Sequence, residues 1–321
     1  MRPEDLFFSV IMPTHNRPAD LANALASLRR QSHTNFEAIV INDGQEPVGS
    51  VVDMCGLERV TLLTTTGSLG PGAARNAGFA AARGDIISYL DDDDLYRPEH
   101  LAVHAEKYAA DGDLHVVYTD AERGVPYGTG LETEVVHSRD FDADAFMVSN
   151  YIPILCLSHR RSCLDRTGGF EESLYYLEDW DLFLRLSEHW NFLHVERVTA
   201  LYVEKGNGNL QQEHSGNIVK NLDAVYQRVE PILAIDPVRR ERVWQMRLKY
   251  LGKMAYDTGV HLEKTGDLES AAGIFERAAE YVPEPEYYLS LARVRKALGQ
   301  PDKALVAMQL AQRCLELKRA K

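Results

Sequence analysis

Four aspartates in a row, residues 91–94, follow directly on the apolar run IISYL. Carboxylates this close repel one another, and each loses hydration where a site is partly enclosed. A divalent cation would relieve the repulsion, because Mg²⁺ and Mn²⁺ take one or two protein carboxylates together with water and phosphate oxygens. The run therefore predicts a site for a metal and a phosphate-bearing ligand, where the cation neutralises charge on a departing diphosphate.

A second acidic pair, Glu178 and Asp179, opens the stretch EDWDLFLRLSEHW, whose apolar spacing is typical of an amphipathic helix. Acids in a first helical turn are also explained by the helix dipole alone. The flanking aromatic residues of LYYLEDW argue for more, because partial desolvation raises a carboxyl pKa towards the range of a useful general base. We therefore predict that this pair takes part in chemistry.

The elements that position these acids alternate in type along the first two thirds of the chain. Short β-rich runs (FFSVIM, FEAIVIN, VTLLTT and IISYL) are joined by helical stretches at residues 17–32 and 70–84. This alternation predicts βαβ units and an α/β fold with a doubly wound, mainly parallel sheet. Further strands are expected at HVVYTD, ILCLSHR and FLHVERVTALYV.

Polar residues follow three of the predicted strands where the strands stop. They are Pro13, Thr14, His15, Asn16 and Arg17 after the first strand, Asn42, Asp43 and Gly44 after the second, and the four aspartates after IISYL. Open α/β sheets bind ligands beyond the carboxyl ends of their strands, so we expect these residues to converge on one site. For any single aspartate, a turn or a helix cap is as good an explanation as a ligand site. For the whole set of residues, a ligand site is the better explanation.

The segment GPGAAR, residues 70–75, raises an alternative, because it follows a strand, opens a helix and lies 19 residues (counted from Gly72) before Asp91. A dinucleotide-binding fingerprint has a similar layout. Its third glycine position is Arg75 here, and that side chain would block close helix–strand packing. A nicotinamide enzyme would also need only one acid of the four. A dehydrogenase is therefore disfavoured.

Composition narrows the class of partner. The 321 residues are 45% hydrophobic and carry a net charge of −13. Residues 1–219 hold 17 basic against 34 acidic residues, whereas residues 220–321 hold 18 against 14. The acidic first part argues against nucleic acid, which needs a basic face. No apolar run approaches the length of a membrane span and no signal peptide is evident, so we expect a cytoplasmic protein, at most at the inner face of the membrane, with four reduced cysteines.

Five blocks in order carry a resemblance: SVIMPTHNR, VINDG, GPGAARNAG, YLDDDDLYRP and GGFEESLYYLEDWDLFLRL. Together they resemble a family 2 glycosyltransferase of the GT-A fold, over residue 7 to about residue 205. The resemblance implies transfer of a sugar, with inversion, from a nucleoside-diphosphate sugar, in the first place a UDP-sugar. It implies an acceptor hydroxyl on a glycan, a lipid-linked glycan or a protein.

The resemblance also implies roles around the nucleotide. The block with Pro13 and Arg17 would bind the nucleotide sugar, and its Thr14 and Asn16 would hold the base and ribose. Asp43 resembles the carboxylate that accepts the uracil N–H. Further along, Arg75 resembles the basic residue near the base and phosphate, and Gly72 would let the backbone approach the phosphate.

In the aspartate run, the family pattern D-x-D-D is placed on Asp91, Asp93 and Asp94. The resemblance implies Asp93 as the ligand of Mn²⁺ or Mg²⁺ and Asp91 as a contact to the ribose or sugar. Asp92 occupies the variable position of this pattern and is counted with the nucleotide-sugar site. Because it is also an aspartate, a register shifted by one residue stays open.

For catalysis, the resemblance implies Asp179 as the general base that takes the acceptor proton, with Glu178 orienting it. His214 lies in the loop EKGNGNLQQEHSGN, residues 204–217. It would add a metal or phosphate contact, or it is a mobile loop residue without such a role.

After residues 1–217, which we predict as the catalytic domain, residues 218–321 are expected to be helical. Gly266, Ala271 and Ala278 recur as Gly299, Ala304 and Ala311, each 33 residues on, and Phe275 recurs as Met308. This spacing resembles two tetratricopeptide repeats, which would bind an acceptor or form a homodimer. The basic stretch at residues 239–253 would touch a membrane surface, or is a plain amphipathic core helix. A non-catalytic scaffold on a degenerate fold is the alternative, but the intact acidic residues favour the enzyme.

Overall fold

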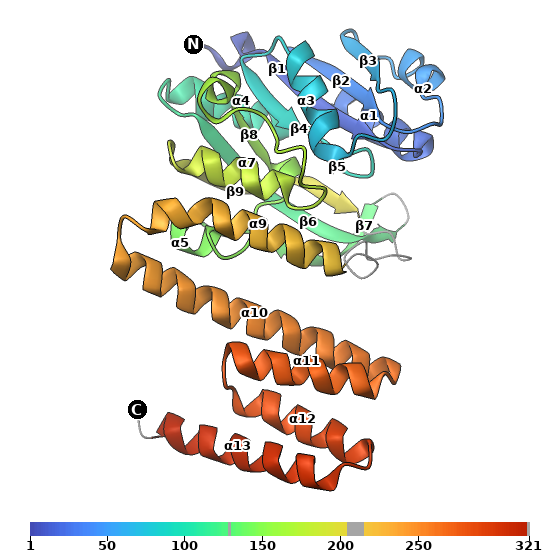
Figure 1. Cartoon of the computed structure of the whole chain (residues 1–321). Coiled ribbons are helices and arrows are strands. Elements are labelled where there is room, and N and C mark those ends of the chain that lie inside the picture. Colours follow the sequence, from blue (N-terminus) through green and yellow to red (C-terminus); the bar gives the residue numbers. More distant parts are fainter. Residues whose placement is uncertain (128–129, 204–214, 320–321) are drawn as a thin grey trace. The chain divides into compact units, whose positions relative to one another are not determined.

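The computed structural model describes residues 1–127, 130–203 and 215–319 (Figure 1). The chain divides into two units. The first comprises Met1–Phe146 and Asn150–Pro231, and the second comprises Met147–Ser149 and Ile232–Lys321.

The first unit is built on a sheet with the order β3-β2-β1-β4-β8-β6-β9-β5, and β7 pairs with β6. The strands are β1 (Phe8–Thr14), β2 (Phe36–Asn42), β3 (Val60–Thr64), β4 (Ile86–Tyr89), β5 (Leu95–Tyr96), β6 (Val116–Tyr127), β7 (Gly130–His137), β8 (Leu157–Arg160) and β9 (Phe192–Val203). Strands β1 to β4 are mutually parallel, and β8 joins them to the parallel pair β6 and β9 by antiparallel pairing. The predicted α/β fold class is confirmed, as a mixed sheet whose N-terminal half is parallel.

Helices lie on both faces of the N-terminal half of the sheet. The helices of the first unit are α1 (Pro18–Arg29), α2 (Gly49–Asp53), α3 (Pro71–Ala81), α4 (His100–Ala110), α5 (Ala143–Phe146), α6 (Leu164–Thr167), α7 (Glu178–Ser187) and α9 (Ser215–Leu233), with 3₁₀ turns η1 (Pro3–Asp5), η2 (Ile154–Cys156) and η3 (Arg161–Cys163). Proline occupies the first position of α1 and of α3, where its missing N–H costs nothing. Helix α1 connects β1 to β2, and α3 connects β3 to β4. These two connections give the predicted doubly wound arrangement.

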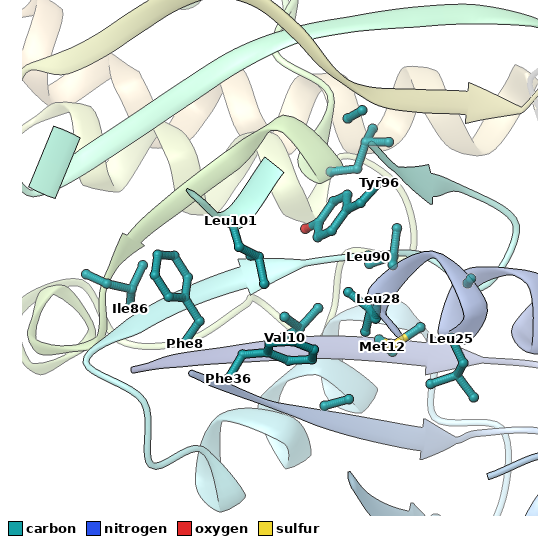
Figure 2. Packing of buried hydrophobic residues seen from close by; sticks show 14 of the residues in the cluster. Phe8, Val10, Met12, Leu25, Leu28, Phe36, Ile86, Leu90, Tyr96 and Leu101 are labelled. Carbon is teal, nitrogen blue, oxygen red and sulfur yellow. The ribbon is translucent and has the colours of Figure 1, made fainter. Parts of the chain in front are cut away.

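The core on one face of the sheet joins β1 to α1 and α4 (Figure 2). Phe8, Val10 and Met12 point to this face because alternate residues of a strand share a side, and Leu25 and Leu101 pack against them. On the opposite face α3 lies close to the strands. A Cβ atom at Gly78 would lie 2.7 Å from Ile11 Cγ2, so glycine permits this close approach. The approach fixes α3, and with it Arg75, against the sheet.

Helix α9 belongs to the first unit as far as Pro231. Its Arg228 forms an ion pair with Asp181 of α7, a carboxylate that is fully buried, and Tyr226 packs edge-on against Trp180 at 5.9 Å. Asn221 Nδ2 donates to the carbonyl oxygen of Tyr176 at 3.0 Å. The boundary predicted at residues 217/218 thus falls near the start of α9, while the structure places the division between the units at 231/232.

Arg228→Met should loosen α9 on the first unit, because Asp181 would then lose one of its two cationic partners in a buried position. An unsatisfied buried acceptor costs about 1–3 kcal/mol. Amide hydrogen exchange in α9 should accelerate accordingly. Arg166→Met, at an exposed arginine of the same unit, provides the control and should leave α9 protected. Equal exchange in the two variants would show that Arg228 does not hold the helix.

The second unit consists of α10 (Pro237–Thr265), α11 (Leu268–Tyr281), α12 (Pro285–Ala297) and α13 (Pro301–Arg319). Gly266 and Gly299 adopt the left-handed conformation at φ +89° and +71°, at the same place in two successive helical hairpins. Phe275 is fully buried, and its ring occupies the space beside Gly259. Its counterpart Met308 is 55% exposed. Among the described helices of the chain, none is long and apolar enough to cross a membrane.

Candidate functional site

The end of β1 meets the aspartate run at the carboxyl edge of the sheet. Thr14 Oγ1 donates to Asp92 Oδ2 at 2.7 Å. Arg17 Nη2 lies 3.0 Å from Asp92 Oδ1, and its Nη1 contacts Asp93. The pairing of β1 with β4 explains this convergence, since parallel neighbours end at the same edge. Pro13, the other residue expected here, lies within β1.

The end of β2 contributes to a cavity of about 520 Å³. Its lining residues are His15, Asn16, Asp43, Gly44, Gln45, Thr65, Thr66, Gly67 and Ser68. Asp43 Oδ1 accepts hydrogen bonds from Thr65 Oγ1 at 2.7 Å and from Leu69 N at 2.9 Å, and its Oδ2 accepts from Gly70 N at 2.8 Å. A carboxylate has about four acceptor positions, so Asp43 fixes the segment before α3 and retains capacity on Oδ2 for a ligand donor.

Asn16 shapes the rim of the same cavity. It adopts the left-handed conformation at φ 57°, and its Oδ1 accepts from the main-chain N–H groups of Gln45 and Glu46 at 2.8 and 2.9 Å. A Cβ atom at Gly44 would lie 2.5 Å from that oxygen, so the turn requires glycine. The amide oxygen of Asn16 thus holds the turn after β2.

The four aspartates occupy two kinds of environment. The side chain of Asp92 is fully buried and Asp94 is buried, whereas the side chains of Asp91 and Asp93 are 27% and 26% exposed. Burial raises the pKa of Asp92 to about 6, and it raises the pKa of Asp94 well above its usual range. Asp94 Oδ1 accepts from Val203 N at 3.0 Å and so ties the run to β9. Asp91 and Asp93 are therefore the members of the run that a ligand can reach.

The donor chemistry of the run suits the metal that it implies. Within the described part of the chain, no group of three or more histidine, cysteine or acidic side chains is arranged to hold a cation. Mg²⁺ and Mn²⁺ do not require such a cage, because they bind through one or two carboxylates when phosphate and water supply the other ligands. The accessible carboxylate of Asp93 fits that role. His214 lies outside the described residues.

Arg75 of α3 joins the aspartate run to the second acidic pair. Its Nη2 lies 2.7 Å from Asp91 Oδ1 and its Nη1 lies 2.6 Å from Glu178 Oε1. Burial opposes the charge of the guanidinium, but the two carboxylates outweigh it and raise the pKa of Arg75 above its usual range. The guanidinium also lies over the Phe170 ring at 5.5 Å. Arg75, expected near the base and phosphate, is thus placed between two acids.

Gly72 lies one turn before Arg75 and faces the protein. A Cβ atom there would lie 3.3 Å from the carbonyl oxygen of Glu171 and 3.7 Å from Glu178 Cγ. The absence of a side chain lets α3 approach the segment that leads into α7. In this structure the space above Gly72 is therefore filled by that segment.

The pair Glu178 and Asp179 begins α7 directly after Leu177, which has the left-handed φ of 65°. Such a conformation costs a branched residue about 1–2 kcal/mol and is typical of functional sites. Burial raises the pKa of Glu178, although Arg75 opposes the shift. Burial, and then the charge of Glu178, raise the pKa of Asp179 to about 7. Asp179 is half-buried, so it can exchange a proton near neutral pH with a group that enters from solvent.

Sequence patterns did not identify two residues that contact acidic side chains of the site. Asn150 Nδ2 donates to Asp179 Oδ2 at 3.0 Å, and Thr65 supports Asp43 from the end of β3. Asn150 lies in an irregular segment without periodicity, so no local signal marks it. Thr65 is the last residue of the predicted strand VTLLTT, where a β-branched residue is common.

The family model described as "Glycosyl transferase family 2" matches residues 9–155. The Bacillus subtilis (strain 168) protein "Uncharacterized glycosyltransferase YwdF" is 28% identical over 212 residues, which cover 65% of this chain and 78% of that protein. The match contains the ends of β1, β2 and β4, where the aspartate run and its neighbours lie.

Two solved structures share the fold. S. aureus TarS 1-349 in complex with UDP-GlcNAc has a TM-score of 0.59 at 16% identity, covering 96% of this chain and 92% of that one. The mannosyltransferase PcManGT from Pyrobaculum calidifontis, in complex with GDP-Man and Mn²⁺, has a TM-score of 0.56 at 18% identity, covering 96% and 86%. At these identities the likeness concerns the fold.

Proposed function

We propose that the chain is a family 2 glycosyltransferase with a GT-A domain, and that it transfers a sugar from a UDP-sugar to an acceptor hydroxyl with inversion. The observation that carries the proposal is the chain of contacts from Asp91 through Arg75 to Glu178. These contacts support the proposal because the Arg75 guanidinium links Asp91 to Glu178, the neighbour of the proposed base Asp179.

The reaction assigns one task to each side of this arrangement. The cavity with Asp43 at its wall would take the base and ribose, and Asp91 and Asp93 would face the diphosphate and sugar. Asp179 would accept the proton of the acceptor hydroxyl as its oxygen bonds to the anomeric carbon and the bond to the diphosphate breaks. Mn²⁺ or Mg²⁺, held by Asp93, would neutralise the charge of the leaving diphosphate.

The donor is proposed from two lines of support. Asp43 retains an acceptor position that suits a ring N–H of a base. UDP-GlcNAc and GDP-Man are the sugar nucleotides in the complexes of the two solved structures, and Mn²⁺ accompanies the second. A screen of UDP-sugars and GDP-sugars with Mn²⁺ or Mg²⁺ tests the proposal, and release of UDP is the expected result. Release of GDP alone would contradict the UDP-sugar donor. Failure to bind or hydrolyse any sugar nucleotide would overturn the whole proposal.

The acceptor side is proposed to involve the second unit. Its two helical hairpins repeat after 33 residues, and the matched glycines Gly266 and Gly299 support a tetratricopeptide-like pair. Such a pair would bind a protein, glycan or lipid-linked acceptor, or a second copy of the chain. With a lipid-linked acceptor the enzyme would act in the cytoplasm at the inner face of the membrane.

Asp93→Asn should weaken Mn²⁺-dependent binding of UDP by about tenfold or more, because the variant loses a charged metal ligand. Calorimetric titration of UDP with Mn²⁺ and then with excess EDTA measures the metal-dependent part. Asp53→Asn, at an exposed aspartate, provides the control for the loss of one charge. If UDP binds to the native protein equally well in EDTA, the metal role of Asp93 is wrong.

A further inference from the structure

Two residues at and just after α5, Phe146 and Asn150, form hydrogen bonds with the first turn of α7. Trp180 Nε1 donates to the carbonyl oxygen of Phe146 at 2.8 Å. Asn150 Nδ2 donates to Asp179 Oδ2 at 3.0 Å. Phe146, Asn150, Asp179 and Trp180 all belong to the first unit. The candidate base is thus held by a side chain from outside its own helix.

The orientation of the Asn150 amide is fixed by a third hydrogen bond. Asn150 Oδ1 accepts from the main-chain N–H of Ile152 at 3.0 Å, and Ile152 is buried. Only the oxygen of an amide accepts from an N–H, so the nitrogen must face Asp179. Flipping the amide would lose both hydrogen bonds. The donor therefore points permanently at the carboxylate.

The two oxygens of Asp179 have different partners. Oδ1 accepts from the N–H of Trp180 at 2.7 Å, within the same turn. Oδ2 accepts from Asn150, so one N–H donor on each oxygen sets the rotation of the carboxyl group. A carboxylate has about four acceptor positions, so Asp179 retains free positions for a further donor.

We propose that Asn150 is a positioning residue for the Asp179 base: its amide favours the charged carboxylate and directs the free acceptor positions to the incoming hydroxyl. The inference rests on the proposed function, since it assumes that Asp179 takes the acceptor proton. It adds to that function a residue that does not touch the reacting atoms.

Three other charged groups around Asp179 also affect its pKa. Glu178 of α7 and Asp91 after β4 oppose its negative charge, whereas Arg75 of α3 favours it. Donation from Asn150 acts in the same direction as Arg75, because a hydrogen bond to the charged form lowers a carboxyl pKa. Loss of this donor should raise the pKa of Asp179, and a second carboxylate in its place should raise it further.

Asn150→Asp separates positioning from support of the turn. The variant keeps an oxygen for the N–H of Ile152, so a merely structural role would survive. It replaces the donor to Asp179 with a like charge. The acid limb of the pH profile for hydrolysis of UDP-GlcNAc or GDP-Man should move up by about one pH unit, because like charges disfavour ionisation. At pH 5, well below the pKa of Asp179 in either protein, kcat should fall about tenfold, the factor that one unit represents, and KM for the sugar nucleotide should hold.

A second readout needs no substrate. The free energy of unfolding of Asn150→Asp should fall relative to the native protein as pH rises from 5 to 8, since two facing carboxylates then ionise. The same substitution in an Asp179→Asn background should lose this pH dependence. Asn191→Asp, at an exposed asparagine, should behave as the native protein does. Asn150→Ala should shift the profile in the same direction by less, which keeps the test valid if the first variant folds poorly.

The outcomes separate the two proposals. A native protein that turns over no sugar nucleotide refutes the proposed function, while the unfolding measurement still tests the contact between Asn150 and Asp179. An active native protein whose Asn150→Asp variant keeps its pH profile, its kcat and its pH dependence of unfolding overturns the inference.

Discussion

Asp179→Asn should lower sugar transfer by about 10²–10⁴-fold, the usual cost of losing a general base. The substitution keeps the size of the side chain and can still accept the N–H of Trp180, but it cannot take a proton. The affinity for the sugar nucleotide should remain unchanged, because the nucleotide cavity is lined by residues from the ends of β1, β2 and β3. Initial rates of nucleoside diphosphate release, with donor affinity measured by titration, provide the test.

The pH profile of the native protein belongs to the same prediction. Burial and Glu178 raise the pKa of Asp179 to about 7, so the protonated, inactive form dominates below neutral pH. Activity should therefore rise with pH through about 7, and the variant should lose this limb. Glu188→Gln, at an exposed acid just beyond the other end of α7, provides the control and should change neither. Turnover near the native level in Asp179→Asn would mean that the base lies elsewhere.

The parallel half of the sheet was predictable because three of its strands, β1, β2 and β4, are buried on both faces. Such strands read as continuous apolar runs, and β1 and β2 are apolar and buried along nearly their whole length. The polar ends of those runs then had to meet at one edge. The contact between Thr14 and Asp92 is an instance of that expectation, because it joins residues 78 positions apart.

The mixed half of the sheet was not predictable in the same way. The runs that become β6 and β8 are visible in the sequence, but nothing local says that β8 pairs antiparallel between β4 and β6. That arrangement depends on the chain crossing back through α5 and η2. The same irregular path brings Asn150 to Asp179, so no helical or strand periodicity in the sequence predicts this contact.

The division of labour within the aspartate run also lies beyond the sequence. Four identical side chains give no indication of which are buried. The structure turns Asp92 towards Thr14 and Arg17 and ties Asp94 to Val203, which leaves Asp91 and Asp93 within reach of a ligand. In the same way, the sequence marked Arg75 as basic and near the site but could not show that it bridges two acids.

Arg75→Met should lower the free energy of unfolding of the first unit by about 3–5 kcal/mol, the usual cost of removing one partner from a buried ion pair. Asp91 and Glu178 would then face each other across an apolar side chain, and Glu178 is buried. The pKa of Glu178, which burial already raises, should rise further. Chemical unfolding, followed by the fluorescence of the buried Trp180, measures the loss.

The loss of unfolding free energy in Arg75→Met should depend on pH, and its direction follows from the pKa shifts. A carboxyl whose pKa in the folded state exceeds its unfolded value holds its proton longer in the folded protein, so stability falls as pH rises through the folded pKa. Removing Arg75 enlarges that difference for Glu178 and Asp179, whose pKa values burial already raises. The gap between variant and native protein should therefore be largest near pH 8 and should shrink towards pH 5, where protonation removes the unpaired charge.

Two matched variants separate charge from shape in this prediction. Arg75→Lys keeps the charge but cannot contact both carboxylates, because an ammonium is a single point where a guanidinium is a fork, so it should recover only part of the stability. Arg197→Met removes an arginine whose ion pair with Glu99 is half exposed, and it should cost less than about 1 kcal/mol. Equal losses for Arg75→Met and Arg197→Met, or a deficit that grows towards pH 5, would contradict the assignment of Arg75 as the cation that holds the two acidic groups of the site together.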